Sequence, residues 1–249
     1  MAIEDRTALV VGASGGIGRA VAVTLAAGGA RVALVGRDRG RLEETRAALG
    51  SAGEGAPIFT CDVTCRAEVG ELARAAPAAL GSVQILVNAV GLNVKNRSLR
   101  SLDPADWDRV VAANLTAAFN LIHFFAPAMR ERGEGLVIQI SSLAGLRASA
   151  VAGAAYSASK FGEAALGLCL GREERGRNIR STVIHAGEVD TPFLDVRAAR
   201  PGGGEATRQR REGILQPADV AAAVRFVAEL PPRAHVPELV IKPTIDDFS

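Results

Sequence analysis

The stretch Thr7-Ala-Leu-Val-Val-Gly-Ala-Ser-Gly-Gly-Ile-Gly18 decides the fold of this chain. Its first half, Thr7–Val11, is a continuous apolar run, which predicts a strand covered on both faces. The glycines that follow lead into an amphipathic segment, Ile17–Ala27. Glycine here permits a tight turn and close approach of a pyrophosphate to the backbone, and a helix N-terminus offers free N–H groups. A glycine cluster can be only a turn, but its place between strand and helix favours nucleotide binding.

The same alternation of short apolar runs and longer amphipathic segments continues along the chain. It predicts strands at Thr7–Val11, Arg31–Val35, Pro57–Cys61, Ile85–Asn88, Leu136–Ile140, Ser181–His185 and Glu238–Ile241. It predicts helices at Ile17–Ala27, Arg41–Leu49, Pro104–Phe125, Ala154–Arg175 and Pro217–Leu230, with Asp103 as an N-cap before Pro104. Such alternation implies right-handed crossovers. We therefore expect an α/β fold: one domain over residues 1–249, with a doubly wound parallel sheet of about seven strands and helices on both faces.

Composition excludes several classes of protein. A formal net charge of +2 gives no electrostatic case for a nucleic-acid or membrane-surface partner. Cys61, Cys65 and Cys169 have no zinc-site spacing and indicate reduced thiols. The N-terminus lacks the pattern of a secretory signal, and we expect no uncharged apolar stretch of about 18 residues that could span a membrane. A cytoplasmic protein is expected. The glycine- and arginine-rich region around 190–215 predicts a mobile surface loop or a lid over a substrate.

The glycine spacing G-x-x-x-G-x-G resembles that of the short-chain dehydrogenase/reductase family, and the resemblance continues from Thr7 to about Ile241. It implies a Rossmann-type fold and a nicotinamide cofactor. The residues that it assigns to cofactor binding are Gly12, Ser14, Gly15, Gly16, Ile17, Gly18, Arg37, Asp62, Val63, Asn88, Ala89, Gly91, Tyr156, Lys160, Val189 and Thr191. Among them, Asp62 would receive the adenine amine, and Val189 and Thr191 would hold the nicotinamide carboxamide.

The end of the second predicted strand indicates which cofactor is used. An NAD-specific site usually has an acid there to accept hydrogen bonds from the ribose 2′-hydroxyl. This chain has Val35-Gly-Arg37 instead, and a guanidinium suits a 2′-phosphate. The Ser14 hydroxyl could add a further contact. Arg37 could also merely begin a solvated helix, since Arg39 and Arg41 follow; the favoured prediction is NADP(H).

The pair Tyr156 and Lys160 carries the predicted chemistry. Tyr156 is the chain's one tyrosine, and residues four apart share a helix face. A cation about 4 Å away, at an effective dielectric of roughly 20, stabilises a phenolate by about 4 kcal/mol, or about three pKa units. This brings a phenol with a pKa near 10 toward neutrality, where it can act as general acid and base. A tyrosine that packs beside an exposed lysine is the structural alternative.

Further residues belong to the predicted catalytic site. Ser141 and Ser142 end the fifth predicted strand, where the family has its catalytic serine, and Ser142 is preferred over Ser141. Its hydroxyl would bond the substrate oxygen. Asn114 resembles the family's asparagine that anchors a water chain to the lysine. No metal is expected, because the histidines are scattered and the sequence has no His, Cys and Asp cluster.

Three positions depart from the family pattern. Val11 stands in place of threonine, Ala89 in place of the second asparagine of Asn-Asn-Ala-Gly, and Ala186 in place of proline. Because losing both partners of a buried polar contact can be nearly neutral, we hypothesise that Val11 and Ala89 reflect a joint apolar repacking.

The predicted function is therefore hydride transfer between NADP(H) and a carbonyl or secondary alcohol, with Tyr156 as acid and base. The main alternative is a catalytically silent NADP(H)-binding sensor or scaffold. A nucleic-acid binder that uses the arginines of 197–211 would need interleaved aromatics and a basic overall balance, and the sequence has neither. The C-terminal run resembles members that act on small oxo-acids or 3-hydroxy acids, and thioesters, ketosteroids and sugars are further candidates. Family habit suggests a homotetramer or dimer.

Overall fold

The computed structural model describes residues 3–194 and 213–245. Seven parallel strands form one sheet in the order β3-β2-β1-β4-β5-β6-β7. The strands are β1 (Thr7–Val11), β2 (Arg31–Gly36), β3 (Ile58–Thr60), β4 (Ile85–Asn88), β5 (Gly135–Ser142), β6 (Ile179–Ala186) and β7 (Glu238–Ile241). All seven predicted strands are confirmed, and so is the doubly wound parallel fold.

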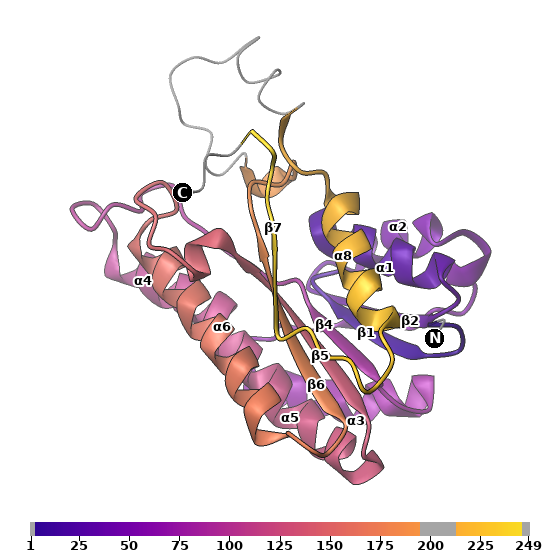
Figure 1. Cartoon of the computed structure of the whole chain (residues 1–249). Helices are drawn as coiled ribbons and strands as arrows, with labels where there is room; N and C mark the ends of the chain where they lie inside the picture. Colours follow the sequence, from indigo (N-terminus) through magenta and orange to yellow (C-terminus); the bar gives the residue numbers. More distant parts are fainter. Residues whose placement is uncertain (1–2, 195–212, 246–249) are drawn as a thin grey trace.

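Helices cover both faces of the sheet (Figure 1). They are α1 (Gly16–Ala27), α2 (Arg39–Ala48), α3 (Arg66–Leu80), α4 (Pro104–Val111), α5 (Ala117–Arg132), α6 (Ala154–Glu173) and α8 (Pro217–Glu229). The α4 N-cap is as predicted, since the Asp103 carboxylate accepts a hydrogen bond from the Ala105 N–H at 2.8 Å.

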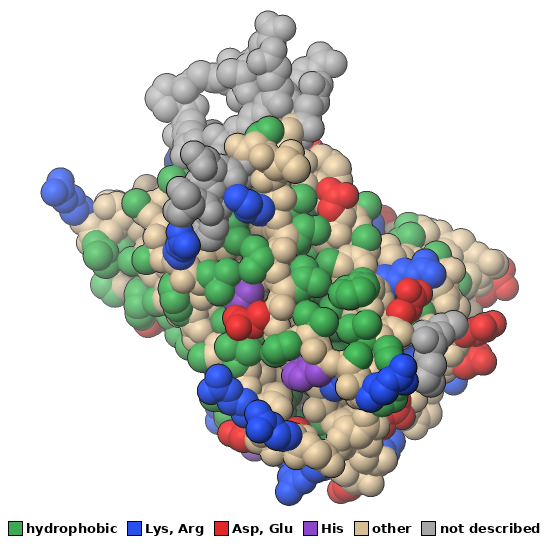
Figure 2. All heavy atoms as spheres, viewed as in Figure 1, with side chains coloured by type: hydrophobic (Ala, Val, Ile, Leu, Met, Phe, Trp, Pro, Cys, Tyr) green, Lys and Arg blue, Asp and Glu red, His purple; other side chains and the backbone are tan. Residues whose placement is uncertain are grey.

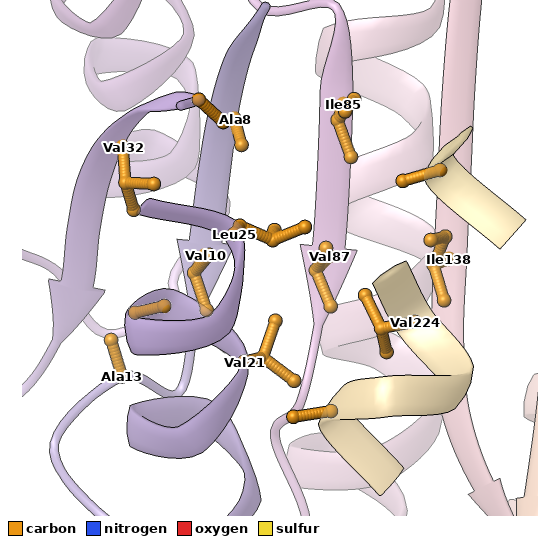
Figure 3. Packing of buried hydrophobic residues seen from close by; sticks show 14 of the residues in the cluster. Ala8, Val10, Ala13, Val21, Leu25, Val32, Ile85, Val87, Ile138 and Val224 are labelled. Atoms are coloured by element: carbon orange, nitrogen blue, oxygen red, sulfur yellow. The ribbon is translucent and has the colours of Figure 1, made fainter. Parts of the chain in front are cut away.

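Two apolar clusters hold the layers together. One packs α1 and α8 on the sheet, where Val21 and Leu25 of α1 and Val224 of α8 meet Val10 and Val87 (Figure 3). The other packs α3 and α5 on the opposite face, with Leu9, Val11, Val35, Leu72, Leu121 and Phe125 among its members. Because most of these strand residues are fully buried on both faces, the strands are nearly continuous apolar runs.

The strand order fixes where a ligand can bind. The chain moves from β1 outward to β2 and β3, then returns to the other side of β1 with β4. At such a switch point the connections leave in opposite directions and open a crevice beyond the carboxyl ends of the strands. The turns after β1, β2, β4, β5 and β6 all lie at this edge, and these turns hold most of the predicted site residues.

Two local structures were not predicted. The inward stripe of α3, Val69, Leu72, Ala76 and Leu80, has ordinary helical spacing, but the helix was missed because the many alanines around the stripe blur it and Pro77 interrupts the pattern. Between α4 and α5, residues Ala112–Thr116 form a π-helical segment in which the Ala117 N–H bonds the Ala112 carbonyl, five residues back. Residue periodicity does not show a single widened turn of this kind.

The run from α4 through α5, Pro104–Arg132, is by length and composition sufficient to cross a membrane. This corrects the expectation that no such segment occurs. Its inner face, including Ala117, Leu121 and Phe125, packs into the sheet cluster. The core helix of a soluble protein passes the same test, so the run is weak evidence for a membrane.

Apolar side chains also gather on the outside, over the face that carries α8 and β7 (Figure 2). Phe226 and Val240 are each 52% exposed, and Ile245 is 63% exposed. Strand β7 is an edge of the sheet, so this surface lies beside unpaired backbone groups.

The hypothesis of joint repacking at Val11 and Ala89 is wrong in its geometry. Val11 is 1% exposed and packs in the α3–α5 cluster, whereas Ala89 packs against the α1–α8 cluster. Their bond is between backbones, from the Ala89 N–H to the Val11 carbonyl at 2.9 Å. The two apolar residues are therefore separate adaptations.

We expect Val11→Thr to lower the free energy of unfolding by about 1–3 kcal/mol, because it buries a hydroxyl. The cross-strand neighbour of Val11, Asn88, already donates to Gln139 and accepts from Val90. Urea unfolding measures the change. Val240→Thr, on an exposed strand position, is the control and should have little effect. A variant at position 11 as stable as the parent protein would contradict this account.

Candidate functional site

The turn after β1 is built so tightly that glycine is required. A Cβ at Gly18 would lie 2.1 Å from the Gly12 carbonyl oxygen. Gly12 has a φ of +85°, and a Cβ there would lie 2.9 Å from the Ala89 carbonyl group. Gly16, with a φ of +52°, faces the methyl group of Thr191. The turn thus contacts the segments that follow β4 and β6, and the predicted residues Gly12, Gly16, Ala89 and Thr191 meet at one place.

One side of this turn fits a phosphorylated ribose. The Ser14 Oγ is buried and has no hydrogen-bond partner within the described residues. Gly36 makes room for it, since a Cβ there would lie 2.2 Å from that oxygen. The Arg41 guanidinium lies over Gly15, 3.0 Å from where a Cβ would be. An unpartnered hydroxyl beside a guanidinium and a glycine cradle fits an anionic group of a dinucleotide.

Arg41 was missed as a candidate, because three arginines at the start of a helix are typical of a solvated face. Arg37 is exposed at the end of β2, and its charge lies close enough to Asp62 to help lower the pKa of that carboxyl. The Asp38 carboxylate that follows Arg37 caps α2, since its Oδ1 accepts from the Arg41 N–H at 3.1 Å.

Asp62 and Val63 form the next part of the crevice. Partial burial opposes ionisation of Asp62, but hydrogen bonds from the Thr64 side chain and backbone outweigh it and lower the pKa of Asp62. The Val63 carbonyl accepts a hydrogen bond from Asn120 of α5 at 3.1 Å. This bond anchors the loop after β3 to the helical layer. Both bonds from Thr64 use Oδ1 of Asp62, so among residues 3–194 and 213–245 no partner takes its Oδ2, which is left for a ligand.

The Asn88 side chain makes its hydrogen bonds to other groups inside the protein. Its amide donates to Gln139 at 2.8 Å and lies 3.5 Å from Glu163, and its Oδ1 accepts from the Val90 N–H at 3.1 Å. A ligand contact from this turn would therefore come from the backbone. Gly91, three residues on, is exposed, and a Cβ there would lie 4.0 Å from the Lys160 Nζ.

Asn114 lies in the π-helical segment and is fully buried. Its side chain accepts from the Leu92 N–H at 2.7 Å, donates to the Leu92 carbonyl at 3.0 Å and donates to Ser159 at 2.9 Å. Because π-bulges turn a residue out of the regular helical register, they often occur at functional sites. Here the bulge lets Asn114 join the loop after β4 to α6.

The structure separates the two serines that end β5. Ser141 is 5% exposed and its hydroxyl donates to the Lys160 carbonyl beneath α6. Ser142, which points the other way, is half-buried at the strand end, and its Oγ accepts from the Ala144 N–H at 3.2 Å. The Ser142 carbonyl lies 3.2 Å from the ring nitrogen Nδ1 of the buried His185. Of the two, Ser142 is the serine that a ligand at this edge can reach.

Tyr156 and Lys160 lie on the inward face of α6, as predicted. Tyr156 is 9% exposed, and its ring centroid lies 5.7 Å from that of Phe193 and 6.0 Å from the Lys160 Nζ. The ammonium is 2% exposed and donates to the Ile140 carbonyl at 3.0 Å and to Glu163 at 2.7 Å. Burial alone would lower the pKa of Lys160, but the Glu163 carboxylate outweighs burial and raises the pKa above its ordinary value.

Glu163 was not predicted as part of the site. Its side chain is fully buried. A glutamate three residues after a lysine on a helix is usually read as an exposed ion pair, so the pattern Lys-x-x-Glu could have pointed to it only once Lys160 was known to face inward. On the other side of the crevice, Val189 is buried beside Leu215, while Asp195 to Glu212 lie outside the described residues.

Comparison with known proteins agrees with this geometry. The family model for short chain dehydrogenase matches residues 6–201. The chain is 31% identical to an uncharacterized oxidoreductase of Staphylococcus saprophyticus, over 97% of this chain and 98% of that protein. It is 35% identical to the glycine betaine reductase of Emericella nidulans over 97% of this chain, but spans only 19% of that longer protein. The closed form of a serine dehydrogenase in complex with NADP+ superposes with a TM-score of 0.86, at 29% identity, over 98% of this chain and 97% of that one.

We expect Gly18→Ala to destabilise the protein strongly, because its methyl group would overlap the Gly12 backbone and no flexible side chain can move aside. A fall of several degrees or more in the thermal melting temperature is expected. Gly15→Ala is the matched control, since its methyl group meets only the mobile end of Arg41. Equal melting temperatures for the two variants would contradict the proposed packing of the turn.

Proposed function

The chain belongs to the short-chain dehydrogenase/reductase family, and on this premise we propose that it is an NADP(H)-dependent oxidoreductase that interconverts a carbonyl compound and its alcohol. The observation that carries the proposal is the buried pair Tyr156 and Lys160 on α6, with the Ser142 hydroxyl at the end of β5. The short helix after Ser142, Leu143–Gly145, packs against α6, which supports a shared site for the three side chains.

In the reductive direction, Tyr156 donates its phenolic proton to the substrate oxygen, and in the oxidative direction it takes the proton back. The Ser142 hydroxyl donates a hydrogen bond to the same oxygen, where negative charge develops. The Lys160 ammonium stabilises the phenolate form of Tyr156. When bound, NADP(H) supplies the hydride to the substrate carbon or accepts it in the reverse reaction.

Lys160 also has a donor left for a bound cofactor. An ammonium group has three N–H donors, and two are used by Ile140 and Glu163. The third is available to a ribose hydroxyl, counting acceptors within the described parts of the chain. Asn114 supports this end of the site by fixing Leu92 and Ser159.

The proposed choice of NADP(H) rests on charge at the end of β2. Arg41 lies over Gly15 and Arg37 follows β2 near Asp62, while Arg19 reaches the Ser14 carbonyl at 3.5 Å. Within the described residues, Ser14 offers an unpartnered hydroxyl. The carboxylate that an NAD-specific site requires is replaced by Gly36 and Arg37, and Asp38 is used as a helix cap. The similar serine dehydrogenase is a complex with NADP+, which supports the same choice.

The surroundings of Tyr156 favour an apolar substrate group beside the reacting carbon. The ring packs in a cluster with Val94, Ala144 and Ala152, against which Leu92 and Phe193 also pack. The neighbouring Asn93 is 3% exposed, and its side chain donates to the Ala152 carbonyl and accepts from the Val94 N–H. The second candidate function, a silent NADP(H)-binding sensor, would not require a buried cation beside the phenol.

We expect Tyr156→Phe to lower kcat/KM by about 10²–10⁴-fold, because the proton donor is lost. The assay follows reduced-nicotinamide absorbance with a panel of carbonyl compounds and alcohols, with NADP(H) and NAD(H) in parallel. Binding of NADPH, measured by fluorescence titration, should persist. A variant with undiminished turnover would remove Tyr156 from the mechanism, and a parent protein that binds NADPH but turns over no substrate in the panel would favour the sensor.

We expect Arg37→Ala to weaken NADPH binding by about 10–100-fold, since a charge-assisted contact contributes about 1.5–3 kcal/mol. Binding of NADH should change little. Arg41→Ala should act in the same direction, while Arg39→Ala, an exposed arginine paired with Glu43, is the control. Equal losses for NADPH and NADH would show that the arginines do not recognise the 2′-phosphate.

A further inference from the structure

Glu163 is a fully buried acid in direct contact with the proposed catalytic machinery. Its Oε2 lies 2.7 Å from the Lys160 Nζ, and its Oε1 lies 3.5 Å from the Asn88 amide. The Ser141 hydroxyl also lies beside it. The carboxyl thus has donors from α6 and β4 beside it, and the same Asn88 amide also donates to the buried Gln139 of β5.

Such a group is costly to bury. Burial raises the pKa of Glu163, and the Lys160 ammonium and Ser141 hydroxyl oppose this. A well-packed apolar side chain often stabilises a protein as well as a buried ion pair does, so a buried pair is weak evidence for stability. Stability alone therefore does not account for this pair, whose lysine lies beside the Tyr156 ring.

We propose that Glu163 is a positioning residue of the active site, whose buried carboxylate keeps Lys160 charged and holds its Nζ between Ile140 and the Tyr156 ring. This inference rests on the proposed function, because Lys160 matters only if Tyr156 exchanges protons. It assigns to Glu163 a role that acts through Lys160 and not through the substrate.

The effect of removing Glu163 on the Lys160 ammonium depends on the groups that face this ammonium. From α6 these are Tyr156 and Glu163, and from β5 the Ile140 carbonyl. From the turn after β4, Gly91 contributes backbone alone. Within the described residues, Glu163 is the largest of the influences that offset the desolvation of the ammonium, ahead of Tyr156.

Removal of the Glu163 carboxylate changes the pH at which Lys160 loses its proton. Without the carboxylate, desolvation lowers the pKa of Lys160, and the amine loses its proton at a lower pH. The limb of the pH profile for alcohol oxidation that reports loss of the Lys160 proton should therefore move to lower pH in Glu163→Gln.

The first experiment does not depend on activity. The chain has three lysines, Lys95, Lys160 and Lys242, so protein labelled with ¹³C and ¹⁵N at lysine gives few side-chain signals to assign and titrate by NMR. In the parent protein Lys160 should stay protonated beyond the ordinary range of lysine, and in Glu163→Gln its midpoint should fall by about one pH unit or more. A parent Lys160 that titrates below the ordinary range would overturn the proposal without any variant.

The second experiment compares pH profiles of kcat/KM for Glu163→Gln and Glu174→Gln. Glu174 is also a buried, ion-paired glutamate, but it contacts Arg130 and Arg177 at the far end of α6. Both variants should lose stability, and only Glu163→Gln should shift the limb that reports Lys160. A limb that stays in place with an unchanged Lys160 titration would reduce Glu163 to a structural residue and overturn the inference. Failure of the proposed function would look different: no turnover in the parent protein, while the lysine titration still reports the pair.

Discussion

The buried ammonium of Lys160 is the interaction on which the site depends. A lysine can be 2% exposed only if acceptors replace its water, and here a strand carbonyl and a glutamate do so. Because those acceptors come from β5 and α6, the charge can form only when the helix lies on the sheet in one register. The same contact also positions the phenol of Tyr156, which lies one helical turn away on α6.

The crevice beside this pair is defined by close backbone contacts. The turn after β1 touches the turn after β4 through Gly12 and the loop after β6 through Gly16. Glycine is needed at these points because another chain segment occupies the space of a side chain. The dinucleotide site and the proton-exchanging pair therefore belong to one rigid edge of the sheet, where most of the strand ends contribute a group.

Much of this could be predicted from the sequence, since strand ends, glycine spacing and the Tyr156 to Lys160 interval are local patterns. The choice between Ser141 and Ser142 is visible only once the strand's alternation is fixed against α6. Glu163 and Arg41 were missed for one reason: charged residues in a helix are usually solvated, and only packing shows which face is buried. The pattern of helix α3 was obscured by its small residues and Pro77. The separation of Val11 from Ala89 could not be predicted, because it depends on which face of the sheet each side chain occupies.

The widened turn at Ala112–Thr116 has a consequence for how this chain can change in length. One extra residue is accommodated there, and the helix downstream keeps its phase because of it. Deletion of one residue within this turn would restore a regular spiral and leave α5 in phase, whereas a deletion in the regular turns on either side would rotate α5 by about 100° about its axis. Leu121, Phe125 and Met129 would then swing away from the sheet. The length of the regular turns is thus fixed by the rotational setting of α5, and tolerated insertions should fall in surface loops instead.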